Sequence, residues 1–90
     1  MRLRPADHVR WAVNRSGVTL VDMRSGRAFV LAYPDAAVWD LLTRDGDAGR
    51  LTAKIARIAD IDVERASRLV SDLTQRLRVE GLLASENPHG

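Results

Sequence analysis

The strongest pattern in this 90-residue sequence is an apolar stripe in the segment from Val63 to Glu80. Asp62 precedes the segment and can cap a helix, because its carboxylate can accept a hydrogen bond from a free N–H of the first turn. Gly81 follows where a C′ glycine would stand, and residues 82–83 can fold back as an apolar closing segment. The segment is therefore predicted to be a long amphipathic helix, whose apolar side chains fall within about 120° of arc at about 100° per residue. These side chains are Val63, Ala66, Leu69, Val70, Leu73 and Leu77.

Two shorter helices are expected before this one. The first begins at about Pro34, whose fixed φ suits the first turn of a helix, and ends near Thr43. Residues 44–49 break the helical pattern. Thr52 is expected to cap the second helix, which ends near Asp60. The inward-facing side chains of the two helices are predicted to be Ala37, Val38, Leu41, Leu42, Ile55 and Ile58.

Three short runs of β-forming residues precede the helices: Arg10–Asn14, Val18–Asp22 and Arg27–Ala32. The two links between them contain Gly17 and Gly26, where a turn or bulge can use a positive φ. The runs therefore predict a three-stranded antiparallel sheet. Three strands followed by three helices predict an α+β domain of winged-helix-like form.

The length and composition of the sequence exclude several classes of protein. Ninety residues fit one small domain, and the absence of cysteine excludes disulfides, thiolate metal sites and a thiol nucleophile. Residues 1–9 and 84–90 have few apolar side chains, so they are expected to be flexible tails around a domain of residues 10–83. No apolar run approaches the roughly 20 residues of a membrane span, and no signal peptide is visible. A cytoplasmic protein without a membrane partner is expected.

Candidate catalytic and metal-binding residues are few. The histidines, His8 and His89, both fall in predicted tails, whereas a catalytic acid or base needs a rigid support. The segment Asp45-Gly46-Asp47 has some similarity to a calcium loop, but the further ligands and the closing Glu are missing. Turns and helix caps explain the acidic residues better. No catalytic residue, metal site or cofactor is therefore predicted, and the protein is expected not to be an enzyme.

Three segments, taken in order, resemble the PqqD family: residues 20–31, residues 37–42 and residues 72–83, the last ending in Gly-Leu-Leu. Members of that family are peptide chaperones, also called RiPP recognition elements. They bind the leader of a ribosomally synthesised precursor peptide and present it to a modifying enzyme. The resemblance extends from about Val9 to Leu83. Many members have Leu-Asn where Ala32-Tyr33 stand here, so the turn into the first helix can differ.

The resemblance implies a binding site between the third strand and the last helix. A strand at a sheet edge has unpaired N–H and C=O groups, so an extended leader can add to it as a further strand. From the residues alone, a third strand covered by the protein's own helices remains an alternative. Arg65 and Arg76 border the apolar stripe of the helix and could meet acidic neighbours in the leader. The predicted peptide-binding residues are Arg27, Ala28, Phe29, Val30, Leu31, Arg65, Leu69, Val70, Leu73, Arg76 and Leu77.

Other partners remain open. A winged helix can also bind DNA, as in a transcriptional regulator, but the arginines of the last helix alternate with Glu64, Asp72 and Glu80, so no face of one sign emerges and nucleic acid is less favoured. The resemblance implies a separate enzyme: a radical S-adenosylmethionine enzyme, a leader protease as in lasso-peptide maturation, or a cyclodehydratase-type partner. Two exposed third strands could also pair in a homodimer. Trp11 is a candidate contact for an enzyme or a second copy.

Overall fold

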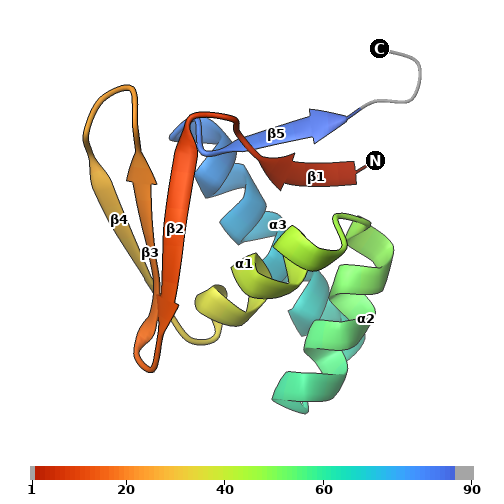
Figure 1. Cartoon of the computed structure of the whole chain (residues 1–90). Coiled ribbons are helices and arrows are strands. Elements are labelled where there is room, and N and C mark those ends of the chain that lie inside the picture. Colours follow the sequence, from red (N-terminus) through yellow and green to blue (C-terminus); the bar gives the residue numbers. More distant parts are fainter. Residues whose placement is uncertain (1, 87–90) are drawn as a thin grey trace.

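The computed structural model describes residues 2–86, with side chains described as far as residue 84. Strands β2, β3 and β4 form an antiparallel sheet in that order, and β1 pairs separately with β5. Figure 1 shows the three-stranded sheet standing on one side of the helices. The predicted α+β arrangement, with a three-stranded antiparallel sheet followed by three helices, is confirmed. The elements are β1 (Arg2–Pro5), β2 (Val9–Asn14), β3 (Gly17–Asp22), β4 (Ala28–Ala32), α1 (Asp35–Arg44), α2 (Ala48–Ala59), α3 (Val63–Val79) and β5 (Leu83–Glu86).

The two predicted tails are largely ordered strand, which corrects the expectation for residues 2–9 and 84–86. Strands β1 and β5 pair antiparallel along their whole length, as the neighbouring red and blue arrows of Figure 1 show. Leu3 is buried, and its N–H donates to the carbonyl of Gly46 at 2.8 Å. Pairing the two ends satisfies their backbone groups and buries Leu3 and Leu83 together. Residue 1 and residues 87–90 of the predicted tails lie outside the described residues.

The core lies between the inner face of the sheet and the helices. Trp39 of α1 is fully buried at its centre, and the ring of Trp11 meets it edge-on with centroids 5.4 Å apart. Trp11 therefore contacts the core through its ring while remaining partly exposed. The other buried apolar side chains from the sheet, α1 and α3 are Val9, Val18, Leu20, Leu31, Ala36, Val38, Leu42, Ala66, Val70, Leu73 and Leu77.

Helix α2 begins earlier than predicted, which corrects the role expected of Thr52. Its N-cap is Asp47, whose side chain accepts a hydrogen bond from the N–H of Arg50 at 2.9 Å. Thr52 lies inside the helix, and its hydroxyl donates to the carbonyl of Ala48. Ile58 is 64% exposed rather than buried, because the last turn of α2 extends beyond the core and residues 57–60 are all exposed.

Helix α3 has the predicted caps but a shorter buried stripe. Asp62 accepts from the N–H of Arg65 at 2.8 Å, which confirms it as the N-cap. Gly81 has φ of 76°, and the N–H of the next residue, Leu82, donates to Leu77 at 2.8 Å, as in a glycine-terminated helix. Val63, predicted to belong to the stripe, is exposed because it stands in the first turn, ahead of the packed residues. None of the helices within residues 2–86 has the length and apolar composition needed to span a membrane.

Candidate functional site

Strand β4 forms one edge of the three-stranded sheet, and its hydrogen-bonding pattern shows which backbone groups face outward. The N–H of Asp22 in β3 donates to the carbonyl of Arg27 at 2.9 Å. Along a strand, successive residues direct their backbone groups to opposite sides. Positions 27, 29 and 31 therefore face β3, and positions 28, 30 and 32 face outward. In the described part of the protein no strand pairs with this outer edge.

A groove of about 270 Å³ lies directly beside this open edge. One wall is β4, and the other is the last turns of α3 together with the residues that follow it. The floor is apolar, since Leu31, Leu77 and Leu82 are buried and Phe29 is half-buried. The outward-pointing side chain of Val30 is 74% exposed. The lining residues are Phe29, Val30, Leu31, Arg76, Leu77, Glu80 and Leu82.

Two ion pairs join the α3 wall of the groove to the segments just before and just after β4. Arg27 lies 3.5 Å from the Glu80 carboxylate, and its guanidinium carbon stands 5.1 Å from the centre of the Phe29 ring. Arg76 donates to Asp35, the first residue of α1, at 3.1 Å. One pair joins the start of β4 to the end of α3, and the other joins α3 to the segment that follows β4. Charged groups therefore mark both ends of an apolar groove.

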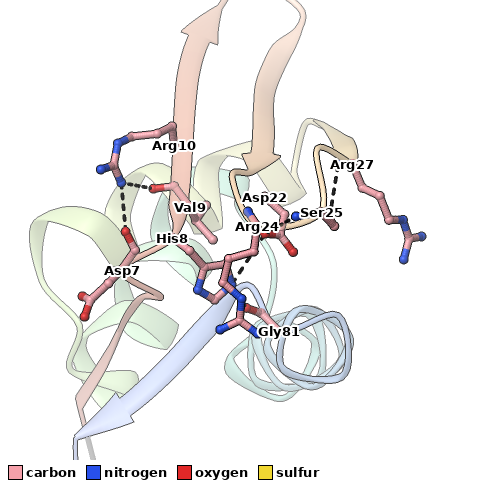
Figure 2. A network of polar contacts seen from close by, with 9 residues as sticks. All are labelled: Asp7, His8, Val9, Arg10, Asp22, Arg24, Ser25, Arg27 and Gly81. Atoms are coloured by element: carbon pink, nitrogen blue, oxygen red, sulfur yellow. Dashed lines mark hydrogen bonds and ion pairs between the residues drawn. The ribbon is translucent and has the colours of Figure 1, made fainter.

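The turn between β3 and β4 determines where Arg27 lies. The Asp22 carboxylate accepts hydrogen bonds from the backbone N–H groups of Arg24 at 2.8 Å and Ser25 at 3.3 Å (Figure 2). The bond from Arg24 is the main reason that the pKa of Asp22 lies below its usual value, because it favours the charged carboxylate. Gly26 supplies the positive φ of 76° that closes the turn. The Ser25 hydroxyl then accepts from the N–H of Arg27.

His8 connects the sheet to the end of α3, which corrects its expected place in a flexible tail. Its Nε2 lies 3.0 Å from the carbonyl oxygen of Gly81, to which it donates, and 3.9 Å from the Asp22 carboxylate (Figure 2). The neighbouring backbone is also bonded to the sheet, since the His8 carbonyl accepts from the N–H of Met23 at 2.8 Å. This contact holds the end of α3 beside the β3–β4 turn. The other histidine, His89, lies outside the described residues.

The structure places seven of the eleven predicted residues in the groove or at its border. Phe29, Val30, Leu31, Arg76 and Leu77 line the groove, and Arg27 stands at its rim. Ala28 presents its backbone at the open edge, because position 28 is one of those that face away from β3. Their role as peptide contacts stays a prediction.

The remaining predicted residues lie elsewhere on α3. Val70 and Leu73 are buried in the core, Leu69 is half-buried against it, and Arg65 is exposed in the first turn of the helix. The α3 residues that line the groove, Arg76 and Leu77, come from its last turns, and these four residues are not among the lining residues.

Sequence reasoning missed two residues of the groove, Glu80 and Leu82. Glu80 follows Arg76 by one helical turn, and this spacing places the two on the same side of α3. That spacing was visible in the sequence. The pairing of Glu80 with Arg27 was not visible, because the two residues come from distant segments.

Three acidic residues outside the groove, Asp45, Asp47 and Asp62, serve a turn or a helix cap. The Asp45 Oδ2 accepts a hydrogen bond from the Arg50 Nε at 2.7 Å. This hydrogen bond holds the pKa of Asp45 far below its usual range. Asp47 caps α2 and Asp62 caps α3. Within residues 2–86 no three histidine or acidic side chains gather as metal ligands would.

Comparisons with known proteins identify a matching family and a matching fold. A family model described as Coenzyme PQQ synthesis protein D (PqqD) matches residues 17–83. A solved structure described as "Lasso peptide synthetase B1 complexed with the leader peptide" has a TM-score of 0.84 at 19% identity, covering 94% of this chain and 100% of that chain. Another, described as "TbiB1 in Complex with the TbiA(beta) Leader Peptide", has a TM-score of 0.86 at 21% identity, covering 93% and 98%. No curated protein matches the sequence significantly. The two structures therefore share the fold of this protein.

Proposed function

This chain belongs to the PqqD family, and from that membership we propose that it is a non-catalytic peptide chaperone, a RiPP recognition element. It binds the leader of a ribosomally synthesised precursor peptide as an added strand on β4, beside α3. The bound leader is then presented to a separate enzyme of natural-product biosynthesis. The observation that carries this proposal is the open outer edge of β4 next to an apolar groove.

The geometry suits an extended guest peptide. A guest beside β4 meets the outward N–H and C=O groups of Ala28, Val30 and Ala32, and each strand hydrogen bond contributes roughly 1 kcal/mol net. Its inward side chains enter the groove, where each Leu- or Phe-sized anchor contributes about 1.5–3 kcal/mol. Ordering a flexible peptide opposes these gains. Micromolar to nanomolar affinity, about −8 to −12 kcal/mol, is attainable from such terms.

The similar structures support the same ligand class. Both are described as complexes with a leader peptide, and both share the fold of this protein over nearly its whole length. The description of one as a lasso peptide synthetase component favours a leader protease of lasso-peptide maturation as the enzyme partner, over a radical S-adenosylmethionine enzyme. This protein and its partner enzyme are expected to act together in the cytoplasm.

Backbone amide shift mapping tests the proposal. The probe is a synthetic leader peptide, chosen from the precursor reading frames that neighbour the gene. Shifts are expected to cluster in residues 28–32 and 76–82, because these residues form the open edge and the groove. Shifts clustered on β2, or no saturable shifts with any neighbouring leader, would contradict binding at β4.

Sedimentation tests the homodimer that two open β4 edges could form. The guest and a second copy would compete for the same backbone groups, so a dimer built this way must dissociate when the leader is added. A dimer that persists at saturating leader uses another surface.

A further inference from the structure

The α3 wall of the groove carries two opposite charges one helical turn apart. Arg76 and Glu80 both line the groove, and each is paired with a charge from a segment that flanks β4. Arg76 contacts Asp35, the third residue after the end of β4, and Glu80 contacts Arg27, which directly precedes the first residue of β4. The positive charge of α3 therefore lies toward the C-terminal end of β4, and the negative charge toward its N-terminal end.

Both charges on α3 remain able to bind a guest. The side chain of Arg76 is 61% exposed, and that of Glu80 is 36% exposed. The hydrogen bond to Asp35 uses one nitrogen, Nη2, of a guanidinium that has further N–H donors. The Glu80 contact to Arg27 is long, at 3.5 Å through Oε2, and a carboxylate can accept several further hydrogen bonds. The Arg76 end of the groove can thus bind an acidic side chain of the guest, and the Glu80 end can bind a basic one.

The direction of the guest follows from the sheet. All pairings in β2–β3–β4 are antiparallel, and an antiparallel guest continues that ladder with slightly more stable pairing than a parallel one. An antiparallel guest places its N-terminal part beside Ala32 and its C-terminal part beside Ala28. Its early residues then approach Arg76, and its later residues approach Glu80.

We propose that the groove selects leader peptides by the order of their charged residues: an acidic residue before the apolar anchors and a basic residue after them. This inference rests on the proposed function and specifies the substrate class of the same site. The guest's groove-facing side chains alternate along the strand, so the acid, the anchors and the base are separated by single intervening residues. Arg76 and Glu80 are the residues that select this order.

Selection from a random peptide library tests the proposal without knowledge of the natural leader. Peptides of about 12 residues, long enough to extend past both ends of β4, are displayed and selected on the immobilised full-length protein. Enriched sequences are expected to carry Asp or Glu before the apolar pair and Lys or Arg after it. A resynthesised peptide in this order should bind about fivefold more tightly than the same peptide with its acid and base exchanged.

A charge-swapped protein provides the second arm. The double variant Arg76→Glu with Glu80→Arg keeps the net charge and is expected to enrich the inverse order. The matched control is Arg68→Glu with Asp72→Arg, a basic–acidic pair with the same spacing on α3 that does not line the groove. The control should retain the order selected by the unchanged protein. Circular dichroism and thermal unfolding check that both variants fold.

The outcomes separate this inference from the proposed function. Apolar anchors enriched without any charge order, or with the base first, would overturn the inference while leaving peptide binding at β4 intact. If the charge-swapped variant enriches the same order as the unchanged protein, Arg76 and Glu80 do not determine that order, and the inference is overturned as well. Failure to enrich any peptide over an unrelated protein would contradict the proposed function itself.

Discussion

Replacing Val30 with proline should weaken leader binding while leaving the fold in place. The N–H of Val30 faces the outer edge of β4, so proline removes a donor offered to the guest and no bond to β3. Its side chain is 74% exposed, so little core packing is lost. Proline is tolerated in edge strands where the N–H faces outward.

The size of the effect follows from the lost contacts. One strand hydrogen bond contributes about 1 kcal/mol net, and the proline ring also pushes the guest away from the adjacent backbone groups. A total loss of about 1–2 kcal/mol is expected, which lowers affinity roughly 5- to 30-fold. Fluorescence anisotropy with a labelled leader peptide measures it.

Val13→Pro is the matched control. Val13 is the same residue type on the opposite edge strand, is 54% exposed, and by the same alternation has its N–H directed away from β3. Similar thermal unfolding of the two variants would show that they fold alike. Unchanged affinity in Val30→Pro would refute strand addition at β4, and a selective loss in Val13→Pro would move the guest to β2.

Three further predictions concern α3 and the acidic residues. Leu73→Glu should abolish stable folding, because it places a charge in the core at a cost of several kcal/mol; a cooperative unfolding transition near that of the unchanged protein would disprove this. Arg76→Glu should fold, since the side chain is largely exposed, but weaken leader binding; an unaltered titration would remove Arg76 from the site. The hydrogen bond from Arg50 lowers the pKa of Asp45 and therefore stabilises the folded protein. This stabilisation is present above the ordinary carboxyl pKa of about 4 and is lost as the pH falls toward the folded-state pKa. Asp45→Asn should therefore flatten the acid side of a stability profile measured by urea unfolding, and an identical acid dependence would contradict the argument.

Local patterns predicted most of the regular structure because short-range physics governs it. The glycine-bearing links, the Asp62 cap and the Gly81 terminator each act within a few residues, and all appear as expected. The start of α2 was misplaced because Asp47 and Thr52 are both acceptable caps by residue type, and the structure uses Asp47.

Long-range contacts could not be predicted in the same way. Strands β1 and β5 are short and polar, and each is stable only because the other end of the protein lies beside it. His8 was expected in a tail for the same reason, since its partner Gly81 is 73 residues away. Family resemblance pointed to β4 and α3, but could not tell which turns of α3 reach the strand.

By itself the amino-acid sequence determined the order of strands β2–β4 and the three helices, the caps of α3, and an α3 helix with one apolar side. Tertiary structure alone decided that the outer edge of β4 stays unpaired within residues 2–86, that the last turns of α3 stand beside it, and that Arg76 and Glu80 face the groove as an ordered pair of charges. The reason is physical: backbone propensity and periodicity act over neighbouring residues, whereas an open edge and a groove depend on which distant segments pack together and which surfaces they leave uncovered.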